Sequence, residues 1–447
     1  INDPTKTVVA FVAPAVRSVI SSHFGIPYDA ASPFMAGLLK KLGFDKVFDF
    51  SFAADLTIVE ETTEFLNRVA EKGVMPQFTS CCPGWVNFVE RRYPEIIPHL
   101  STCKSPQQMM GATVKNHYAE LAGIAKKDLF VVSVVPCIAK KYEAARSEFA
   151  PDGIRDVDAV ITSSEMLEML ALSRMDTTDI VPQEFDDPYK HVSGAGILFG
   201  ASGGVAEAAL RMAVEQLTGN ALTDQLDFEE IRGFEGVKEA TVKANGTTVR
   251  VAVISGLNNA EPIIQKIIQG IDVGYDLIEV MACPGGCICG AGHPVPEKIG
   301  VLTQRQQVLV DIDKTSTYRK SQENPDILRL YHDFYGEANS PLAHRLLHTH
   351  YTPVKGDRTS GNIRKKADSA FVTREFTICT CETCSGKGSE ELYNKLAAQI
   401  KELKMDAFIK VSTIRLKETH NGEEVYITLD GKRIPESKLK NLYEIIR

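Results

Sequence analysis

Leu129–Val135 has the sequence LFVVSVV and runs directly into Pro136 and Cys137. Its apolar side chains are continuous rather than alternating, which is typical of a strand buried on both faces of a parallel sheet. Helix-like patterns such as Leu56–Glu71 lie between further short runs of this kind, which occur at Thr7–Val12, Lys46–Phe50, Val157–Thr162 and Leu277–Met281. The sequence therefore predicts an α/β fold with parallel or mixed sheets flanked by helices.

Cysteines follow three of the expected strands directly. Cys81 and Cys82 come after Pro76–Phe78, Cys137 comes after Val135, and Cys283 comes after Val280. In such sheets, ligands bind outside the carboxyl ends of the strands, so we expect the three loops to meet at one edge. One antiparallel hairpin is expected at Ala240–Ile254, with its turn at Asn245-Gly246.

Composition narrows the class of protein. The chain has 447 residues, a net charge of −8 and ten cysteines. The charge argues against nucleic acid or an anionic membrane as the main partner, and no apolar run reaches the roughly 20 residues of a membrane span. Clustered cysteines without a secretory signal favour metal ligation in a reducing, cytoplasmic setting. Because the first residue is Ile1, we expect a processed chain or a fragment.

A second, smaller domain is expected at the C-terminal end. Pro353–Ser369 is rich in Lys, Arg, Gly and Ser and is typical of a linker. After it come a strand at Phe371–Ile378, a cysteine loop, a helix, a hairpin around Val425–Leu429 and a last helix. One face of the first of these helices carries Leu392, Leu396, Ile400 and Leu403. The expected boundaries are therefore 1–352, 353–369 and 370–447.

The three cysteine loops have the chemistry of a metal site. They are Thr79–Trp85 (TSCCPGW), Val135–Glu143 (VPCIAKKYE) and Glu279–Gly290 (EVMACPGGCICG). Adjacent cysteines rarely bind one metal together, so one sulfur of the first loop is expected to bind and the other to act differently. Four thiolates from three loops suit a [4Fe–4S] cubane, and zinc is the alternative. The spacing in the third loop does not match the CxxxCxxC motif of radical-SAM proteins.

Taken together, the loops resemble the three signature motifs of iron-only ([FeFe]) hydrogenases, over roughly residues 5–352. The resemblance implies an oxidoreductase that interconverts H2 with two protons and two electrons. It implies an H-cluster, in which a [4Fe–4S] cubane is joined through a cysteine sulfur to a diiron unit with carbonyl, cyanide and dithiolate-amine ligands.

The same resemblance assigns roles to single residues. It implies that Cys81 exchanges protons with the bridgehead amine and that Lys140 hydrogen-bonds a cyanide ligand. An isolated lysine would otherwise be a solvated charge. Val135 departs from the pattern, because many relatives carry Met there. The implied cubane ligands are Cys82, Cys137, Cys283 and Cys287, the last of which bridges to the diiron unit. The implied pocket residues are Ala13, Pro14, Ser105, Gln107, Phe199 and Met281.

A proton path is implied as well. Glu61, Glu64 and Arg68 share one helix face, which without context would be a solvated, salt-bridged surface. In the family pattern, a Glu twenty residues before the free cysteine and a Ser twenty residues after it relay protons. Glu61 and Ser101 occupy those positions relative to Cys81, and Glu64 continues the path toward solvent.

Several other signals have ordinary explanations. We interpret Cys103 as a small core residue and Cys289 as a packed or redox-sensing thiol. Gly194–Gly200 lacks the third glycine of a dinucleotide loop, so we reject NAD binding there and expect the turn to pack near the cluster. His344 and His348 have helical spacing but no third ligand, and we expect them to be structural.

The C-terminal segment resembles the thioredoxin-like [2Fe–2S] domain of some multisubunit hydrogenases. Cys379 and Cys384 match its first cysteine pair, whereas Arg415 and Thr419 stand at the second. We therefore expect a small α/β docking domain without a cluster, unless Cys381 or His420 substitutes as a ligand. A zinc or redox-sensing role for Cys379, Cys381 and Cys384 is the alternative.

The expected electron-transfer partners and the alternative functions depend on which domains and residues the sequence contains. The N-terminal cluster domains of many relatives are absent, so electrons are expected from ferredoxin, from a partner iron–sulfur subunit, or through a missing segment. One alternative is an H2-sensing regulatory protein with the same cluster. The other is an iron–sulfur scaffold or electron-transfer protein without the diiron unit.

Overall fold

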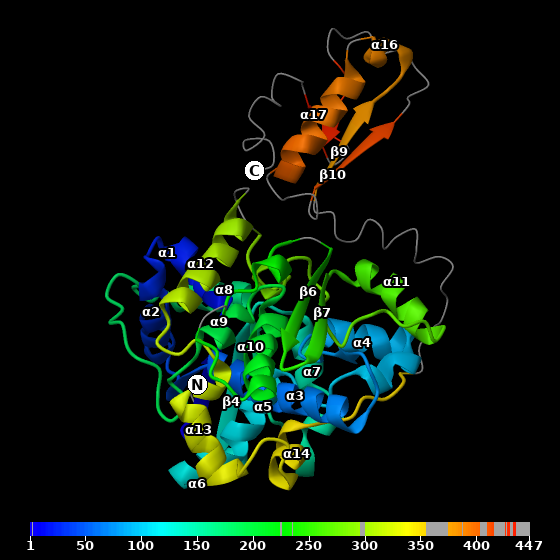
Figure 1. Cartoon of the computed structure of the whole chain (residues 1–447). Helices are drawn as coiled ribbons and strands as arrows, with labels where there is room; N and C mark the ends of the chain where they lie inside the picture. Colours follow the sequence, from blue (N-terminus) through cyan, green and yellow to red (C-terminus); the bar gives the residue numbers. More distant parts are fainter. Residues whose placement is uncertain are drawn as a thin grey trace. The chain divides into compact units, whose positions relative to one another are not determined.

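The structure, a computed structural model, divides into two compact units (Figure 1). One comprises Ile1–Pro294 with Arg305–Gly356, and the other comprises Val295–Gln304 with Asp357–Arg447. The residues described are 1–354 and 374–434, except 2, 224–225, 235, 296–299, 387, 403–408, 415–424, 426 and 430–431. Most of the expected linker, and the expected last helix, lie outside the described residues.

The first sheet of the larger unit has the order β2-β1-β4-β5, and all its strands are parallel. The strands are β1 (Thr7–Val12), β2 (Lys46–Asp49), β4 (Leu129–Val135) and β5 (Ala159–Thr162). β4 has the expected bounds, and five of the six residues of β1 are buried. The parallel sheet predicted from continuous hydrophobicity is therefore confirmed.

The second sheet has the order β3-β8-β7-β6 and is mixed. Its strands are β3 (Gln77–Phe78), β8 (Leu277–Met281), β7 (Thr247–Ser255) and β6 (Val237–Ala244), of which only β6 runs antiparallel to its neighbour. The hairpin turns at Asn245 and Gly246, whose φ angles of 49° and 80° fit a type I′ turn. Two of the cysteine loops leave this sheet, from the ends of β3 and β8.

Helices flank both sheets, as expected. α3 (Ser51–Glu71) packs against α5 (Pro106–Thr113), α9 (Gly194–Leu198) and α10 (Gly204–Thr218), and α10 also contacts β6, β7 and β8. α3 begins five residues before its expected start, because Asp49 accepts a hydrogen bond from the Ser51 N–H. The other α-helices of this unit are α1 (Val16–Phe24), α2 (Tyr28–Lys41), α4 (Pro83–Arg92), α6 (Ala119–Ala122), α7 (Ala139–Ala144), α8 (Ser163–Ser173), α11 (Leu257–Ile268), α12 (Val301–Thr315), α13 (Pro325–Leu330) and α14 (Pro341–Leu347).

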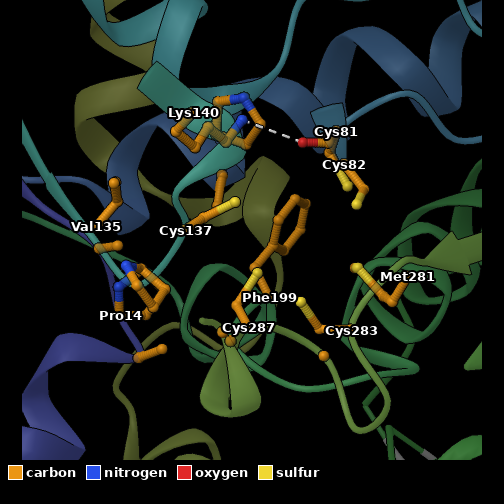
Figure 2. A pocket seen from close by; sticks show the side chains of 18 of the residues that line it. Pro14, Cys81, Cys82, Val135, Cys137, Lys140, Phe199, Met281, Cys283 and Cys287 are labelled. Carbon is orange, nitrogen blue, oxygen red and sulfur yellow. Dashed lines mark hydrogen bonds between the residues drawn. The ribbon is translucent and has the colours of Figure 1, made fainter. Parts of the chain in front are cut away.

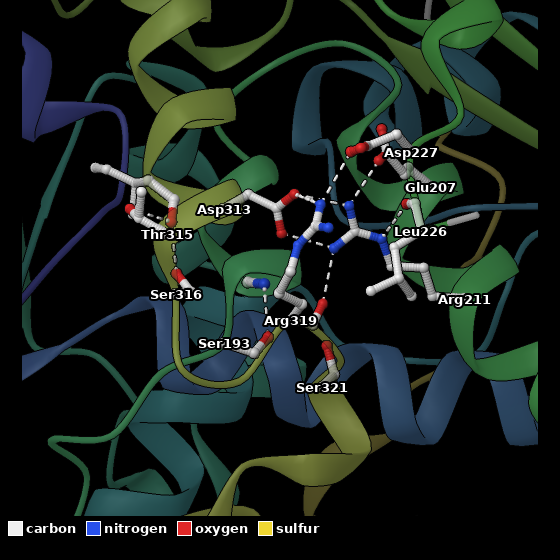
Figure 3. A network of polar contacts seen from close by, with 12 residues as sticks. Ser193, Glu207, Arg211, Leu226, Asp227, Asp313, Thr315, Ser316, Arg319 and Ser321 are labelled. Atoms are coloured by element: carbon white, nitrogen blue, oxygen red, sulfur yellow. Dashed lines mark hydrogen bonds and ion pairs between the residues drawn. The ribbon is translucent and has the colours of Figure 1, made fainter. Parts of the chain in front are cut away.

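A buried ion-pair network joins α10 to α12 (Figure 3). Both terminal nitrogens of Arg211 contact Asp313, at 2.7 and 2.8 Å, and Arg211 also pairs with Glu207. Arg319 is a second partner of Asp313. A Cβ atom at residue 194 would lie only 2.1 Å from Asp313 Oδ1, so only Gly194 allows this approach. The network therefore fixes α9, at the end of which Phe199 enters the cavity described below.

The smaller unit contains a four-stranded sheet of order β10-β9-β11-β12. β9 (Arg374–Cys379) and β10 (Ile409–Ile414) are parallel, while β11 (Ile427–Leu429) is antiparallel to β9 and to β12 (Lys432–Ile434). Between β9 and β10 lie α16 (Glu382–Ser385) and α17 (Ser389–Glu402). Leu396 and Ile400 of α17 are buried on the sheet, as the pattern of apolar residues predicts. Across the described part of the chain, every helix is too short or too polar to cross a bilayer.

Candidate metal centre and proton path

Four cysteines from three loops line one cavity of the larger unit. Cys82, Cys137, Cys283 and Cys287 all line a cavity that is partly open to solvent. Figure 2 shows their side chains pointing into this cavity, with the Phe199 ring among them. The convergence expected at one edge of the sheets is thus observed.

Local structure explains how each thiol reaches the cavity. Cys82 is the residue before α4, and Cys137 follows β4 after Pro136. Between Cys283 and Cys287 the chain turns at Gly285 and Gly286, which both have positive φ angles. A Cβ at Gly286 would lie 2.4 Å from the Ser202 N, so this turn requires glycine.

The sulfurs influence one another electrostatically. Burial raises the pKa of Cys137 to about 11 and that of Cys283 to about 12, and Cys82 contributes to both shifts. Burial also raises the pKa of Cys287, with contributions from Cys137, Cys82 and Cys283. Four neighbouring thiolates are therefore unfavourable without a cation. An iron–sulfur cluster or a soft metal ion would supply that compensation.

Lys140 is the charged side chain among the described residues that line the cavity. Its Nζ donates to the Cys81 carbonyl at 3.1 Å (Figure 2) and to Glu143 Oε2 at 3.0 Å. Burial lowers the pKa of Lys140, but Glu143 and the Cys137 thiolate outweigh burial, and the net pKa lies above its usual value. Lys140 is therefore a fixed positive charge that could hold an anionic ligand.

The expected pocket residues fall into two groups. Ala13, Pro14, Phe199 and Met281 line the cavity, together with Val135. Ser105 and Gln107 are not in the lining. They donate to Glu143 Oε2 at 2.9 and 3.1 Å, because this buried carboxylate attracts polar hydrogens away from the apolar cavity. Ser105 and Gln107 therefore help to hold the Glu143 carboxylate, which in turn pairs with Lys140.

The expected proton-path residues lie close together on the buried side of α3. Glu61 is 1% exposed and accepts a hydrogen bond from the Ser80 N–H, while its Oε2 has no hydrogen-bond partner among the described residues. Burial raises the pKa of Glu61 to about 8, with a further contribution from Glu64. Ser101 Oγ donates to Glu64 at 2.7 Å, and Glu64 pairs with Arg68 at 2.7 Å. α3 therefore does not present these carboxylates on a solvated face.

Cys81 also lines the cavity and is nearly buried. Burial raises the pKa of its thiol, and Glu61 and Cys82 add to the effect. A buried thiol of this kind holds its proton until a base or a cofactor removes it.

The remaining cysteines of this unit lie elsewhere. Cys103 is fully buried in the core, and Cys289 packs against apolar residues outside the cavity lining. In the smaller unit, the sulfurs of Cys379, Cys381 and Cys384 lie within 4.8 Å of one another, and all three residues are buried. Arg415, Thr419 and His420 lie outside the described residues.

Comparison with protein families accounts for this arrangement. A family described as iron only hydrogenase large subunit, C-terminal domain, matches residues 6–291, and one described as iron hydrogenase small subunit matches residues 299–354. The chain belongs to the iron-only hydrogenase family. Membership supports iron–sulfur cluster binding, and the small-subunit-like segment points to electron-transfer partners.

Curated relatives of this hydrogenase family member include both enzymes and other proteins. The NADP-reducing hydrogenase subunit HndD of Solidesulfovibrio fructosivorans is 45% identical over 78% of the chain and 60% of its own length. Iron hydrogenase 1 of Clostridium pasteurianum is 40% identical over 78% of the chain and 62% of its own length. The chain thus spans about three fifths of these two relatives. The cytosolic Fe-S cluster assembly factor narfl of Danio rerio is 32% identical over 78% of the chain and 87% of its own length.

Solved structures agree with the fold. The [FeFe]-hydrogenase HydA(deltaEFG) has a TM-score of 0.69 and 41% identity, and the match covers 79% of this chain and 96% of that one. A variant of the [FeFe]-hydrogenase from Chlamydomonas reinhardtii gives the same four values. The α/β fold expected from sequence is therefore confirmed as the [FeFe]-hydrogenase fold.

Two residues near the site, Glu143 and Thr102, were given no role from sequence, and a third, His348, was expected to be structural. Glu143 was quoted in its motif without a role, although its spacing of three residues from Lys140 on a helix was a usable signal. Thr102 and His348 hydrogen-bond to each other at 2.8 Å, although 246 positions separate them. No local sequence pattern joins them.

Proposed function

We propose that this chain catalyses the reversible conversion of H2 into two protons and two electrons at an H-cluster. The observation that carries the proposal is the convergence of four thiols, Lys140 and the additional thiol of Cys81 on one cavity. A purely structural metal site needs neither a buried ammonium nor a fifth thiol. The carboxylates and hydroxyl that lead away from Cys81 give protons a route through an otherwise apolar interior.

The residues present fit the cofactor that this family implies. Cys82, Cys137, Cys283 and Cys287 would hold the cubane, with Cys287 also bonded to the diiron unit. Lys140 would hold a cyanide ligand, because a buried ammonium matches an anionic acceptor. When bound, the H-cluster supplies the redox chemistry that cleaves or forms H2. Ala13, Pro14, Phe199 and Met281 would limit the access of water to it, since they give the cavity an apolar wall.

The proton path is assigned to the chain's own groups. We assign Cys81 Sγ as the thiol that exchanges a proton with the cofactor. Glu61 is mostly protonated at neutral pH, because burial raises its pKa to about 8, and it can therefore pass a proton toward Cys81. Ser101 Oγ, which bonds to Glu64, connects this buried acid to the ion pair of Glu64 and Arg68.

The experiment is hydrogen evolution with reduced methyl viologen, after anaerobic production with the diiron-site maturation machinery. Cys81→Ala is measured in parallel, with Cys103→Ala as the matched control because Cys103 lies outside the cavity lining. Rapid evolution that collapses only in Cys81→Ala supports both the cluster and the role of Cys81. No turnover in the matured wild type contradicts the proposed activity.

A second candidate function is an iron–sulfur scaffold without a diiron unit, favoured by the likeness to narfl. Infrared spectra separate the two, because carbonyl and cyanide bands require the diiron unit. An H2-sensing protein would show those bands but turn over slowly, so specific activity distinguishes it from a catalyst.

We also propose roles for the rest of the chain. The domain division 1–352, 353–369 and 370–447 is retained, with the last part acting as a docking domain in a cytoplasmic complex. Ferredoxin or a partner iron–sulfur subunit would deliver electrons to the cubane. The close approach of Cys379, Cys381 and Cys384 favours a thiophilic metal ion there over a domain without metal.

A further inference from the structure

Glu64 has a third hydrogen-bonding neighbour, Thr102, besides Ser101 and Arg68. The Thr102 hydroxyl lies 3.2 Å from Glu64 Oε1 and 2.8 Å from His348 Nδ1, so it stands between the carboxylate and the imidazole. The other imidazole nitrogen, Nε2, lies 3.0 Å from Glu60 Oε2. His348 is 6% exposed and Glu60 is fully buried. The result is an unbroken series from Glu64 through Thr102 and His348 to Glu60.

The backbone holds this series in place. The Thr349 N–H donates to the Thr102 carbonyl at 2.7 Å, and the Lys104 N–H donates to the Leu347 carbonyl at 2.8 Å. Cys103 and His348 form the antiparallel bridge between these bonds. The segment after α14 therefore pairs with the segment that carries Ser101, which fixes the imidazole beside the proton path.

The hydrogen-bond donors and acceptors of the series allow two arrangements of its protons. If Thr102 donates to the Glu64 carboxylate, His348 donates from Nδ1, and a second proton on Nε2, which faces Glu60, makes the ring an imidazolium. If instead Glu64 is protonated, it donates to Thr102 Oγ1, and the hydroxyl donates to a neutral Nδ1. The two arrangements differ by the net transfer of one proton between Glu64 and His348.

We propose that Thr102 and His348 form a side branch of the proton path, which takes a proton from Glu64 and holds it on the His348 imidazole. In the transfer, the O–H bond of the Glu64 acid breaks as the proton moves to Thr102 Oγ1, and the original hydroxyl proton moves to Nδ1. Glu64 becomes a carboxylate and His348 a cation, and the reverse step returns the proton. Its role in turnover rests on the proposed hydrogenase function, whereas the proton exchange itself does not.

The imidazole lies among several titratable groups. Glu60, which faces Nε2, accepts hydrogen bonds from Tyr331 Oη and from the Asn339 N–H at 2.9 Å. The other titratable groups that face the imidazole are Glu64, the Cys103 thiol and His344, whose ring stacks on it at 4.4 Å. The carboxylates on α3 therefore supply the negative charge that an imidazolium needs.

The first test needs no turnover. Histidines of the full chain are labelled with ¹³C, and the His348 signal is assigned by its loss in His348→Gln. Glu64→Gln removes a negative charge from the series, so we expect the imidazole signal to change at lower pH than in the wild type. Thr102→Val should have a comparable effect, whereas Thr102→Ser keeps the hydroxyl and should resemble the wild type. An imidazole signal unaffected by both Glu64→Gln and Thr102→Val overturns the proposal.

The second test uses the matured chain and hydrogen evolution at several pH values. We expect Thr102→Val to lower the maximal rate by roughly tenfold, less than the roughly 100-fold or greater effect of a group on the main path, because a side branch is lost and the main path remains. The pH profile should change, while the KM for the electron donor stays the same. Thr102→Ser should restore rate and profile. His332→Gln is the matched control, because the His332 side chain is 87% exposed and lies outside the series.

The two tests distinguish failure of the proposed proton branch from failure of the proposed hydrogenase function. Wild-type rate and pH profile in both Thr102→Val and His348→Gln overturn the branch as part of the proton path. A coupled His348 signal in a chain that never turns over H2 supports the proton exchange and counts against the proposed hydrogenase function instead.

Discussion

Lys140 Nζ lies 3.0 Å from Glu143 Oε2, and both side chains are less than 10% exposed. Glu143 also accepts hydrogen bonds from Ser105 and Gln107. Lys140 has only the Cys81 carbonyl as a further partner in the described structure. Removal of either member therefore has unequal consequences. The lysine would be left with an almost uncompensated buried charge, while the carboxylate would keep two donors.

The first prediction concerns the stability of variants in which one member of this pair is replaced. Glu143→Gln should lower the free energy of unfolding by roughly 3–5 kcal/mol, the usual cost of an orphaned buried charge. Lys140→Gln should cost less, and Lys140→Met combined with Glu143→Gln should recover part of the loss. Denaturant unfolding of the cluster-free chain measures all three.

Lys141→Gln is the matched control for these variants, because Lys141 pairs with Glu165 at the surface and both side chains are about 40% exposed. Such a pair contributes at most about 1 kcal/mol. Equal effects of Glu143→Gln and Lys141→Gln would mean that the buried pair does not stabilise the chain.

The second prediction concerns pH. Glu61 must carry a proton in order to deliver one, and burial raises its pKa to about 8, so hydrogen evolution should decline as the pH rises through about 8. Glu61→Gln cannot pass a proton and should reduce the rate by roughly 100-fold or more. Glu71→Gln, at the exposed end of the same helix, should leave the rate and its pH dependence unchanged.

The same raised pKa predicts that Glu61→Gln stabilises the chain at high pH, although it lowers the activity. The folded pKa of Glu61 lies above its unfolded value of about 4.5, so its contribution to stability is full below pH 4.5 and is lost as the pH rises through about 8. Glu61→Gln has no charge to bury and should melt at a higher temperature than the wild type at pH 9. A variant that is less active and also less stable at pH 9 would contradict the raised pKa.

Much of this architecture was predictable because parallel sheets place their ligands at one edge. LFVVSVV at Leu129–Val135 predicts β4 with its observed bounds, and the three cysteine loops converge because each follows a strand. Local sequence signals were sufficient to predict β4 and the cysteine loops, since the continuous apolar run and the motif residues lie within a few positions of residues that line the cavity.

Other features could not be predicted, because they depend on contacts between distant segments. Ser105 and Gln107 bond to Glu143 rather than lining the cavity, and the sequence does not reveal which buried carboxylate will attract them. His348 was expected to be merely structural, although pairing of its segment with residues 102–104 brings it beside Glu64. Backbone pairing over such a separation leaves no periodicity in the chain.

The third prediction concerns the cubane ligands. Single replacement by serine of Cys82, Cys137, Cys283 or Cys287 should reduce the iron bound per chain and the absorbance of the [4Fe–4S] cluster, because each is proposed to supply one thiolate. Cys103→Ser and Cys289→Ser should retain both, since neither residue lines the cavity. Iron analysis and absorption spectra after anaerobic reconstitution measure the outcome. Loss of the cluster in Cys289→Ser would require a different ligand set.

The last prediction tests the smaller unit. Three sulfurs bound to one tetrahedral ion at about 2.3 Å lie about 3.8 Å apart, and those of Cys379, Cys381 and Cys384 already lie within 4.8 Å of one another. Small movements would therefore close a trithiolate site. In a full chain whose four expected cubane ligands (Cys82, Cys137, Cys283 and Cys287) are replaced by serine, Co²⁺ should still bind in about 1:1 ratio and give the intense sulfur-to-cobalt absorption of thiolate ligation.

Additional replacement of Cys379, Cys381 and Cys384 should abolish this absorption, whereas additional replacement of Cys103 and Cys289 should not. The comparison matters because the cavity thiols of the larger unit would themselves bind cobalt in the cluster-free chain. If the variant without the four expected cubane ligands binds no cobalt, the three thiols are core residues of a docking domain. Binding that survives loss of all seven cysteines would place the ion on other ligands.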